Sequence, residues 1–508
     1  MNSADKIRPL RSLPDRLDPL RREGKHIVLC HGVFDLLHIG HIRHLSRART
    51  QGDVLVVTVT PDRWVNKGPS RPAFAEDLRL EAIAALAEVD FVALNEWPTA
   101  EETIALLKPD VYVKGGEYRD EDRDVTGGIA RERQAVEAAG GRIAFTDEIT
   151  FSSSSLINAY LPALSEEARS FLSGFAARHS AADVVARLDA ARDLKVLVVG
   201  ETIIDEYQYC AAIGKSSKAP ALVARTESME RFAGGILAVA NHLADFCGEV
   251  SVLTQLGASS SHEAFVREQL DSRIEPVLLE RRDAPTIVKR RFVESYFFTP
   301  MFELYEINDE SLHPDDDNRL CDALLERCPK VDLVVVVDYG HSMLTSNAVD
   351  VLCGESRFLA MNAQANAGNR GYHRLSKYPR ADYVCAAEHE LFLEARDWRG
   401  DLHPILVDVA ARLSCPRIVV TCGKRGALAY GADEGFLETP AMAAKVVDRV
   451  GAGDAFLAAT APLVATGAPF DLVAFVGNVA GAEAVATVGH RRYLRRDAFA
   501  KHIQALLS

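Results

Sequence analysis

A short apolar run, Ile27-Val-Leu-Cys30, leads directly into a segment with the pattern of a helix start, and this pairing constrains the fold most strongly. The connecting segment carries His38 and His41, separated by Ile39 and Gly40. A helix N-terminus presents unpaired N–H groups and the positive end of the helix dipole, so it can bind phosphate without any side chain. A glycine there lets the backbone approach closely, and imidazoles three residues apart share one helical face. The sequence therefore predicts a strand–helix unit that binds nucleotide phosphates.

A zinc site is the alternative interpretation of this segment, because four histidines cluster in it. Zinc sites usually combine such histidines with cysteines or carboxylates until four ligands surround the metal. The sequence here offers no cysteine or carboxylate pattern that would complete the set, so phosphate binding is the favoured interpretation. The histidines are His31, His38, His41 and His44.

The run Gly32-Val-Phe-Asp-Leu-Leu-His-Ile-Gly-His41 resembles the signature of the HxGH nucleotidyltransferases, a Rossmann-like family. That family joins a nucleoside monophosphate unit to a phosphorylated small molecule and releases pyrophosphate. Residues 67–71, 113–118 and 151–157 resemble, in order and spacing, segments of heptose-1-phosphate adenylyltransferases and glycerol-phosphate cytidylyltransferases. The resemblance covers about residues 25 to 160. It implies catalytic roles for His38, His41 and Lys67, and nucleotide binding by Gly32, Val33, Phe34, Asp35, Gly40, Arg71, Lys114, Gly115, Ser152, Ser153 and Ser154.

Two of these assignments have a simpler alternative. A serine run such as residues 152–155 can be a polar loop that caps a helix. Because it follows the strand-like Ile143-Ala-Phe145 and precedes an apolar pair, it also suits a hydroxyl-rich helix start that contacts phosphate. Lys67 can be a solvated surface lysine; within the family pattern, Lys67 and Arg71 would neutralise the triphosphate.

Length and composition predict a protein of two or three domains. A chain of 508 residues is too long for one ordinary hydrophobic core, and 48% apolar with 26% charged residues is typical of a soluble globular protein.

No apolar run approaches eighteen residues and the start lacks the apolar core of a signal peptide, so we expect a cytoplasmic protein without a membrane segment. Nine cysteines without a CxxC pair indicate reduced thiols. The formal charge of −14 argues against a general nucleic-acid surface and favours small anionic ligands.

The pattern of strands and helices divides the chain into four segments. Residues 1–24 are rich in Arg, Asp and Pro and are interpreted as an N-terminal arm that can pack on the body of the protein. Residues 25–164 alternate apolar strands with helical stretches, which predicts a parallel sheet covered by helices. Residues 165–194 are helix-forming and predict a helical linker, and residues 195–508 begin a second βαβ series at Lys195-Val-Leu-Val-Val-Gly200. The fold class is therefore α/β in both halves.

A second phosphate motif lies near the C-terminus, in Asp448-Arg-Val-Gly-Ala-Gly-Asp-Ala-Phe456. The amides of Gly451, Ala452 and Gly453 can bind a transferring phosphoryl group at the start of an apolar helix. Asp454 can then accept the proton of an attacking hydroxyl, although an aspartate at a helix start is often only a cap.

This motif resembles the signature of the ribokinase-like sugar kinases, which have an α/β sandwich fold. Residues 199–205, 232–241 and 420–426 match other family segments in order, so the resemblance spans about residues 195 to 505. Residues 286–291 resemble the strand whose basic residue contacts a sugar phosphate in heptose-phosphate kinases; an exposed strand face is the alternative for its cations. The resemblance implies Asp454 as base, substrate binding by Asp205, Gly234, Gly235, Asn241, Lys289 and Arg291, nucleotide binding by Gly423, Gly426, Gly451, Ala452 and Gly453, and a metal ligand in Glu390.

Three positions depart from the kinase pattern. Glu201 stands where the family usually has Asp, Ala387 replaces the Asn of an Asn-x-x-Glu pair near magnesium, and an Asn-rich segment, residues 361–371, replaces Asp-Pro-Lys. Loss of a group near the metal could weaken phosphoryl transfer, or the Asn-rich segment could reshape the acceptor pocket. We expect an active kinase with altered substrate preference; a degenerate kinase fold kept for ligand sensing or assembly is the alternative.

Both halves together resemble the bifunctional heptose-7-phosphate kinase and heptose-1-phosphate nucleotidyltransferase family, with the two domains in reversed order. The resemblance implies synthesis of a nucleotide-activated sugar, Mg²⁺ as cofactor, ATP in preference to CTP, nucleotide and sugar phosphate as partners, and a homo-oligomer, with dimerisation through the kinase half. The alternatives are a nucleotidyltransferase with a regulatory sugar-binding module, and a non-catalytic assembly protein in which both motifs are relics.

Overall fold

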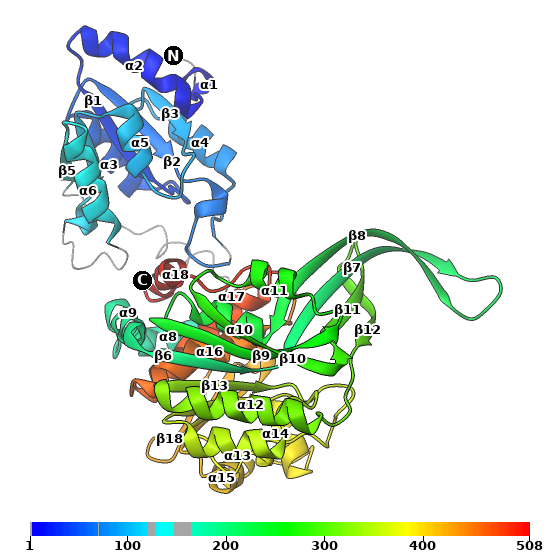
Figure 1. The fold of residues 1–508 in the computed structure, drawn as a ribbon. Helices are drawn as coiled ribbons and strands as arrows, with labels where there is room; N and C mark the ends of the chain where they lie inside the picture. Colours follow the sequence, from blue (N-terminus) through cyan, green and yellow to red (C-terminus); the bar gives the residue numbers. More distant parts are fainter. Residues whose placement is uncertain (1–2, 70, 120–126, 147–163) are drawn as a thin grey trace. The chain divides into compact units, whose positions relative to one another are not determined.

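The computed structural model describes residues 3–69, 71–119, 127–146 and 164–508, and these form two compact units (Figure 1). The first unit comprises Met1–Ser165, Leu172–Val185 and Asp497–Ser508, and the second comprises Glu166–Phe171 and Ala186–Arg496. The segment 165–194, expected to be a helical linker, forms α8 (Glu166–Ala176), α9 (Ala181–Asp189) and a 3-10 turn, Ala190–Asp193.

The first unit is built on a five-stranded parallel sheet of order β3-β2-β1-β4-β5. Because the chain adds β2 and β3 on one side of β1 and then β4 and β5 on the other, the strand order reverses between β1 and β4. Ligands of open α/β sheets bind at such a reversal, outside the carboxyl ends of the strands. The elements are β1 (Ile27–Gly32), α3 (Ile39–Arg49), β2 (Val54–Val59), α4 (Glu76–Ala84), β3 (Phe91–Leu94), α5 (Glu101–Leu107), β4 (Val111–Gly115), α6 (Gly128–Ala138) and β5 (Arg142–Thr146).

The N-terminal segment belongs to the core of this unit. It forms α1 (Ser3–Lys6) and α2 (Leu13–Arg22), and Leu10, Leu13 and Leu17 are buried with residues of α5 and of the sheet. The arm proposed for residues 1–24 is therefore largely helical, and its leucines contribute to the stability of the first unit.

We expect Leu17→Ala to lower the free energy of unfolding of the first unit by about 2–5 kcal/mol, because it removes a fully buried side chain. Urea unfolding followed by hydrogen exchange of peptides from the first unit measures the change. Leu78→Ala is the matched control, since Leu78 is 54% exposed on α4. Equal effects of the two substitutions would contradict the burial of α2.

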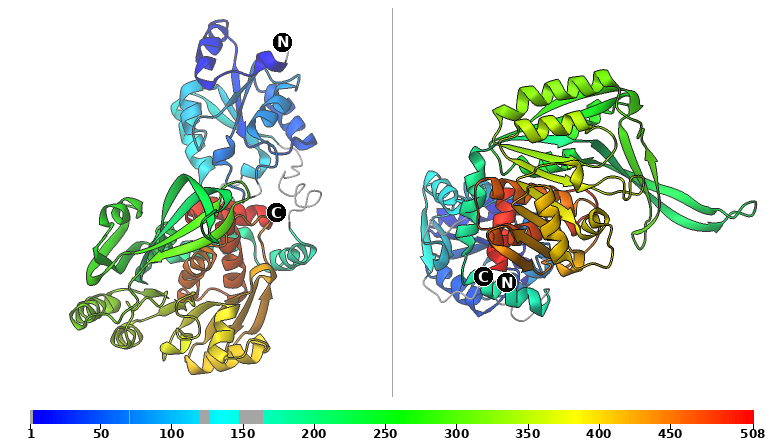
Figure 2. Two further views of the ribbon diagram at one scale, coloured as in Figure 1. Left: turned by 90° about the vertical axis from the view of Figure 1, so that its right-hand side faces the viewer. Right: turned by 90° about the horizontal axis from the view of Figure 1, so that it is seen from below.

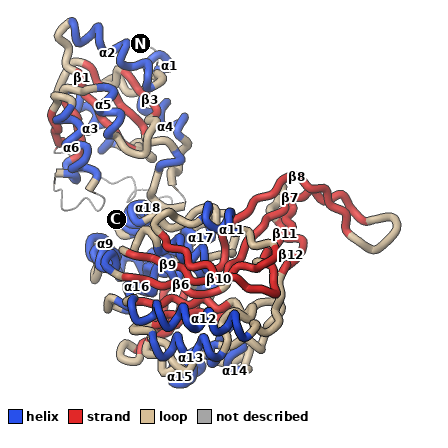
Figure 3. The backbone as a smooth tube through the Cα atoms, viewed as in Figure 1, coloured by secondary structure: helices blue, strands red, loops and turns tan. Residues whose placement is uncertain are grey.

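The second unit contains a nine-stranded sheet of order β10-β9-β6-β13-β14-β15-β16-β17-β18, parallel except that β17 pairs antiparallel with both β16 and β18. Apolar residues of α12 to α15 form one core with the sheet, and α10, α16 and α17 cover its other face (Figure 3). The strands are β6 (Lys195–Gly200), β9 (Glu249–Ser259), β10 (Ile274–Pro285), β13 (Leu333–Asp338), β14 (Leu359–Ala363), β15 (Tyr383–Ala387), β16 (Arg417–Thr421), β17 (Ala427–Gly431) and β18 (Gly435–Thr439). The helices are α10 (Ile236–Leu243), α11 (Glu263–Gln269), α12 (Pro314–Arg327), α13 (Ser346–Glu355), α14 (Glu388–Ala395), α15 (Leu402–Arg412), α16 (Ala452–Ala465), α17 (Phe470–Val485) and α18 (Arg496–Leu506), whose last residues lie in the first unit.

A separate four-stranded sheet, of order β12-β11-β7-β8, accompanies the large sheet in the second unit. Its strands are β7 (Thr202–Lys215), β8 (Leu222–Gly235), β11 (Ile287–Glu294) and β12 (Thr299–Glu306). The β7–β8 hairpin extends away from the rest of the unit, and residues 217–229 at and beyond its turn are exposed (Figures 1 and 2). The other end of the hairpin carries Asp205 and the glycine pair 234–235.

No helix in the described ranges is long and apolar enough to cross a membrane. All nine cysteines are free thiols, and six of them are buried.

Candidate active sites

In the first unit, the segment between β1 and α3 brings His38 and His41 together. His38 caps α3, because its Nδ1 accepts a hydrogen bond from the Gly40 N–H at 3.1 Å. The two imidazoles stack with their ring centroids 4.0 Å apart and their planes 29° apart. An Nδ1 that accepts a hydrogen bond leaves the ring proton of a neutral imidazole on Nε2. The histidine pair therefore lies at the helix start as predicted, and at the reversal of the strand order.

Both imidazoles are uncharged near neutral pH. Burial lowers the pKa of His38, and burial together with the neighbouring His38, His44 and Lys67 lowers the pKa of His41 to about 3. The histidine pair can thus act through ring N–H groups, without the desolvation cost of two adjacent positive charges in a half-buried place. Lys67, half-buried in the loop after β2, supplies a positive charge near this pair.

The other two histidines of the segment have hydroxyl partners of their own. His31 Nδ1 lies 3.0 Å from Thr58 Oγ1, and its Nε2 lies 3.2 Å from Thr60 Oγ1. His44 Nδ1 lies 2.9 Å from the hydroxyl of Thr146. Within the described ranges no group of three His, Cys, Asp or Glu side chains is arranged to hold a metal ion. The structure thus gives the zinc alternative no support.

Asp35 and Arg71, both predicted to bind nucleotide, are partners of each other. Arg71 Nη1 lies 3.5 Å from Asp35 Oδ2, and both side chains are buried. The other Asp35 oxygen accepts the N–H groups of Ala73 and Phe74 at 2.6 and 3.1 Å. This pair fixes the loop that carries Lys67 against the β1–α3 segment, which also contains Gly32, Val33, Phe34 and Gly40.

Arg79 on α4 supports the same loop and was not identified from the sequence. It is buried, and its guanidinium donates to the carbonyl oxygens of Phe74 at 2.9 Å and Val33 at 2.5 Å. An arginine in a helix rich in charges gives no signal that distinguishes it from a solvated one.

Lys114 and Gly115 end β4, beside the carboxyl end of β1. Lys114 Nζ lies 2.9 Å from Glu132 Oε2 of α6, and both side chains are largely buried. Burial alone would lower the pKa of Lys114, but the Glu132 carboxylate raises it well above its ordinary value. The lysine therefore carries a fixed positive charge at the strand reversal. Ser152, Ser153 and Ser154 lie outside the described residues.

In the second unit, a cavity of about 200 Å³ lies where the small sheet meets the start of α16. Its walls also include Tyr339, Gln364, Arg449 and His490, which were not identified from the sequence. Tyr339 and Gln364 follow buried strands, and Arg449 lies within the phosphate motif of residues 448–456, so their positions could have been noticed. His490 carries no sequence signal. Seven predicted residues line the cavity: Asp205, Gly235, Lys289, Arg291, Gly451, Gly453 and Asp454.

Crowding by Asp205 and by the Glu201 backbone requires glycine at positions 234 and 235. A Cβ atom on Gly234 would lie 1.9 Å from Asp205 Oδ2, and one on Gly235 would lie 2.6 Å from the carbonyl oxygen of Glu201. Gly235 also has a φ of 56°. Asp205 forms an ion pair with Arg291, and its Oδ2 lies 3.5 Å from His490 Nε2. Burial acts to raise the pKa of Asp205, but Arg291 and His490 hold it below its usual range, so the carboxylate stays charged.

Asp454 lies in the first turn of α16. Gly451 precedes this helix with a φ of 81°, and the amides of Ala452 and Gly453 open it. The Tyr339 hydroxyl donates to Asp454 Oδ1 at 3.0 Å, and burial raises the pKa of Asp454. A half-buried carboxylate next to a helix N-terminus suits proton acceptance from a hydroxyl that attacks phosphorus.

Six predicted residues do not line the cavity. Two of them, Gly234 and Ala452, adjoin lining residues, and the other four lie elsewhere. Asn241 is buried, donates to the Gln269 carbonyl at 3.0 Å and accepts from the Asp271 N–H at 2.8 Å. Glu390 accepts the N–H groups of Ala387 and Ala365 at 2.7 and 3.1 Å, and burial raises its pKa to about 7. The other two, Gly423 and Gly426, flank a 3-10 turn after β16; a Cβ on Gly426 would lie 2.0 Å from the Thr439 carbonyl oxygen.

Family models match both units. Residues 193–495 match the model described as "pfkB family carbohydrate kinase", and residues 29–159 match the one described as "Cytidylyltransferase-like". The N-terminal part is 42% identical over 144 residues to the "Bifunctional protein HldE" of Syntrophotalea carbinolica, which is 28% of either chain. It is also 42% identical over 154 residues to the HldE of Desulfatibacillum aliphaticivorans, which is 30% of either chain. The chain thus matches less than a third of the length of these curated relatives.

Solved structures share the fold of the second unit. The crystal structure of phosphofructokinase-2 from Escherichia coli in complex with potassium superposes with a TM-score of 0.51 at 17% identity, over 62% of this chain and 99% of that one. The first unit is Rossmann-like and the second is ribokinase-like. Since the kinase model matches more than half of the 508 residues, the chain belongs to the pfkB family of carbohydrate kinases, with a cytidylyltransferase-like domain ahead of the kinase segment.

Proposed function

We propose that each unit catalyses one reaction in the synthesis of a nucleotide-activated sugar. The first unit transfers a nucleotidyl group from a nucleoside triphosphate to a sugar-1-phosphate and releases pyrophosphate. The second unit uses ATP to phosphorylate a sugar or sugar phosphate. Heptose is the proposed sugar and ATP, rather than CTP, the proposed nucleotide of the first unit. The family matches and the two HldE relatives support this pairing of activities.

The stacked pair His38 and His41 is the main support for nucleotidyl transfer. In this reaction a phosphate oxygen of the sugar-1-phosphate attacks the α-phosphorus in line. The new P–O bond forms as the bond to the bridging oxygen of the leaving pyrophosphate breaks. Neutral imidazoles at a helix start donate hydrogen bonds to the oxygens on which negative charge builds up, while Lys67 and Lys114 supply positive charge.

Lys289 is the main support for the proposal that the acceptor of the second unit is phosphorylated. It is only 6% exposed and lines the cavity, yet the described residues offer its Nζ neither an ion pair nor a hydrogen bond. Its neighbours are the rings of Tyr305 and Tyr339, with centroids 5.2 and 5.7 Å from Nζ. Burial lowers the pKa of Lys289, and the carboxylates of Asp205, Glu201 and Glu303 stabilise its charge only from beyond ion-pair distance. A phosphate on the acceptor would supply a direct counterion.

In the proposed kinase reaction, Asp454 accepts the proton of an acceptor hydroxyl. The hydroxyl oxygen bonds to the γ-phosphorus of ATP, and the bond between this phosphorus and the bridging oxygen of ADP breaks. The amides of Gly451, Ala452 and Gly453 lie at the helix start, where they can donate to the transferring phosphoryl group.

Mg²⁺ is the proposed cofactor of both reactions. Magnesium is usually held by one or two carboxylates, several waters and the phosphates of the substrate. Glu390 is the proposed protein contact, and its carboxylate, with a pKa raised to about 7, also accepts two backbone N–H groups. Such a site fits an ion held mainly by the nucleotide. When bound, Mg²⁺ would neutralise part of the charge on the phosphates.

We expect Lys289→Met to raise the KM for a sugar phosphate about 10–100-fold with a smaller change in kcat, since it removes a charged contact to the acceptor. ADP release, measured with sugar phosphates and with neutral sugars, tests this. Lys330→Met is the control, because Lys330 lies on the surface with its side chain 65% exposed. Equal losses with both kinds of acceptor would contradict the phosphate contact.

A second candidate is a nucleotidyltransferase whose kinase-like unit only binds a sugar ligand. The backbone contacts of Glu390 favour this candidate, because they occupy a carboxylate expected at the metal. It predicts that no sugar phosphate yields ADP, although one of them raises the melting temperature of the full chain.

The partners of this enzyme are small molecules, and the proposed assembly is a dimer through the kinase unit. Exposed apolar residues on the small sheet, including Leu222, Met229, Phe302 and Leu304, support a contact there. Sedimentation of the full chain tests it. Since nucleoside triphosphates and sugar phosphates are cytoplasmic metabolites, we also propose a cytoplasmic location.

A further inference from the structure

Tyr339 is the one hydroxyl that the described residues place in a hydrogen bond with Asp454. It follows β13 directly, is 3% exposed and lines the kinase cavity. Its Oη donates to Asp454 Oδ1 at 3.0 Å. A tyrosine ring is rigid beyond its two side-chain torsions, so the backbone position of Tyr339 determines where this donor lies.

The backbone of Tyr339 is held on both sides. Its N–H donates to Glu201 Oε2 at 2.9 Å, and the other oxygen of this carboxylate accepts the N–H of His341 at 3.0 Å. Its carbonyl oxygen accepts from the side-chain amides of Asn366 at 2.7 Å and Asn369 at 3.0 Å.

The two asparagines also support each other. The Asn369 side-chain oxygen accepts the Asn366 N–H at 2.8 Å, and the Asn366 oxygen accepts the N–H groups of Gly368 and Asn369 at 2.9 and 3.2 Å. The Asn-rich loop, residues 361–371, is therefore built to present two amide donors to one carbonyl oxygen.

We infer that Tyr339 is a positioning residue of the kinase site, which orients the Asp454 carboxylate, and that Glu201 and the Asn-rich loop hold Tyr339 for this purpose. The inference rests on the proposed kinase function of the second unit. It also gives one purpose to two departures from the kinase pattern, the glutamate at 201 and the asparagines of residues 361–371, since both meet at the backbone of Tyr339.

The Tyr339 hydroxyl affects proton transfer as well as geometry. Burial raises the pKa of Asp454, whereas the hydrogen bond from Tyr339 stabilises the charged carboxylate and lowers it. Loss of the hydroxyl should therefore raise the pKa of Asp454, and the base would become charged only at higher pH. The ionisable groups that face Asp454 are Asp205 of β7, Lys289 of β11, Cys385 of β15, Glu390 of α14 and His490 after α17.

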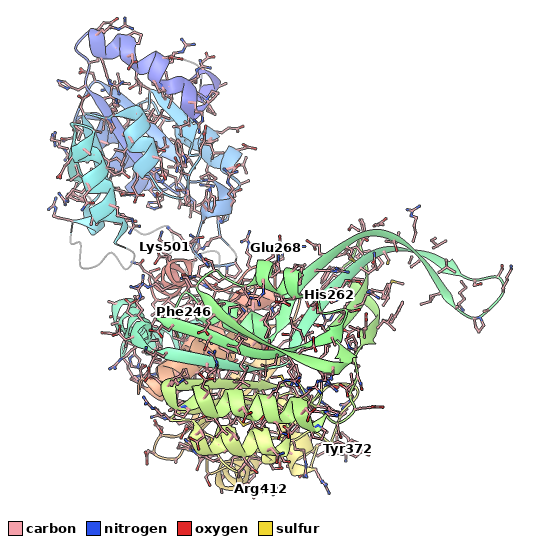
Figure 4. The ribbon with its side chains drawn as sticks, viewed as in Figure 1. Phe246, His262, Glu268, Tyr372, Arg412 and Lys501 are labelled. Carbon is pink, nitrogen blue, oxygen red and sulfur yellow. The ribbon has the colours of Figure 1, made fainter. Side chains whose placement is uncertain are left out.

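The test is Tyr339→Phe in the full chain, assayed for ADP release with a sugar phosphate across pH. We expect kcat to fall about 10–100-fold with KM changed less than about twofold, and the acid limb of the kcat profile to move to higher pH. Tyr372→Phe is the matched control, since Tyr372 follows the same loop and is 92% exposed at the surface (Figure 4). The Tyr372→Phe variant should leave kcat and the acid limb of its pH profile unchanged.

A second variant removes the two amide donors to the Tyr339 carbonyl oxygen and leaves the Tyr339 hydroxyl in place. Asn366→Ala with Asn369→Ala should shift kcat and the acid limb in the same direction as Tyr339→Phe, by a smaller amount. A wild-type kcat and acid limb in Tyr339→Phe would overturn the positioning role, provided that Asp454→Asn is inactive. ADP release that survives Asp454→Asn, or a wild-type chain that releases no ADP from any sugar phosphate, would overturn the kinase proposal and this inference with it.

Discussion

His41→Asn should lower the rate of pyrophosphate release by at least about 10²–10³-fold while ADP release by the second unit remains at the wild-type rate. Loss of one well-placed donor to a developing negative charge has an effect of this size. His41 is half-buried with its pKa lowered to about 3, so it acts as a neutral donor and its loss should be felt equally from pH 6 to 9. Pyrophosphate and ADP release, followed in parallel on the full chain, provide the measurement.

His26→Ala is the control for this experiment. His26 precedes β1, at the opposite end of the strand from the histidine pair, and its side chain is 69% exposed. It should keep both activities. A His41→Asn enzyme with normal pyrophosphate release, or a folded one that has lost ADP release as well, would contradict independent sites.

Asp454→Asn should have the reciprocal effect, with ADP release reduced by about 10²–10⁴-fold, as expected for the loss of a general base. The amide has nearly the shape of the carboxylate and can still accept from the Tyr339 hydroxyl, so the cavity should persist. Sugar phosphate binding should remain within a few-fold of wild type by calorimetry. Pyrophosphate release by the first unit should not change.

Asp433→Asn serves as the control for Asp454→Asn, because Asp433 is exposed in the turn between β17 and β18. If Asp454→Asn retained full ADP release, another group would have to accept the proton. Under the second candidate function, neither the wild type nor any variant would release ADP at all.

Local sequence patterns predict the parts of both sites that depend on backbone geometry. The strand–helix turn with His38 and His41, the glycine pair beside Asp205 and the glycines before Asp454 all follow from what a helix start or a crowded backbone requires. The two helix starts depend on requirements that act within a few residues, so a single segment of sequence contains them. The glycine pair is crowded by Asp205 and Glu201 of the neighbouring part of the chain, so it was indicated by the family resemblance.

Partners that approach from distant elements could not be predicted in this way. Glu132 lies 18 residues from Lys114, and Tyr339 and His490 come from separate parts of the chain to meet Asp454 and Asp205. Glu132 and His490 look like ordinary surface or core residues in their own segments, and the place of Tyr339 after a buried strand does not name its partner, because only the tertiary fold brings these residues to the site.

The N-terminal helix shows a different limitation. Its charges and prolines indicate an arm that can pack on the body, but they do not indicate which residues pack; Leu10, Leu13 and Leu17 follow a helical spacing and are buried. Three leucines over eight residues are too short a pattern to outweigh composition, and only the neighbouring sheet and α5 make them core residues.

The separation of the two sheets in the second unit has a mechanical consequence. Asp205, Lys289 and Arg291 all lie on the four-stranded sheet, which shares no backbone ladder with the nine-stranded one. A movement of this wall relative to the large sheet would therefore bend the chain at Glu201, at Gly235, at Thr286 and after Glu306, without breaking any strand pairing. Admission of an acceptor and expulsion of water would then cost bending at a few backbone torsions rather than local unfolding.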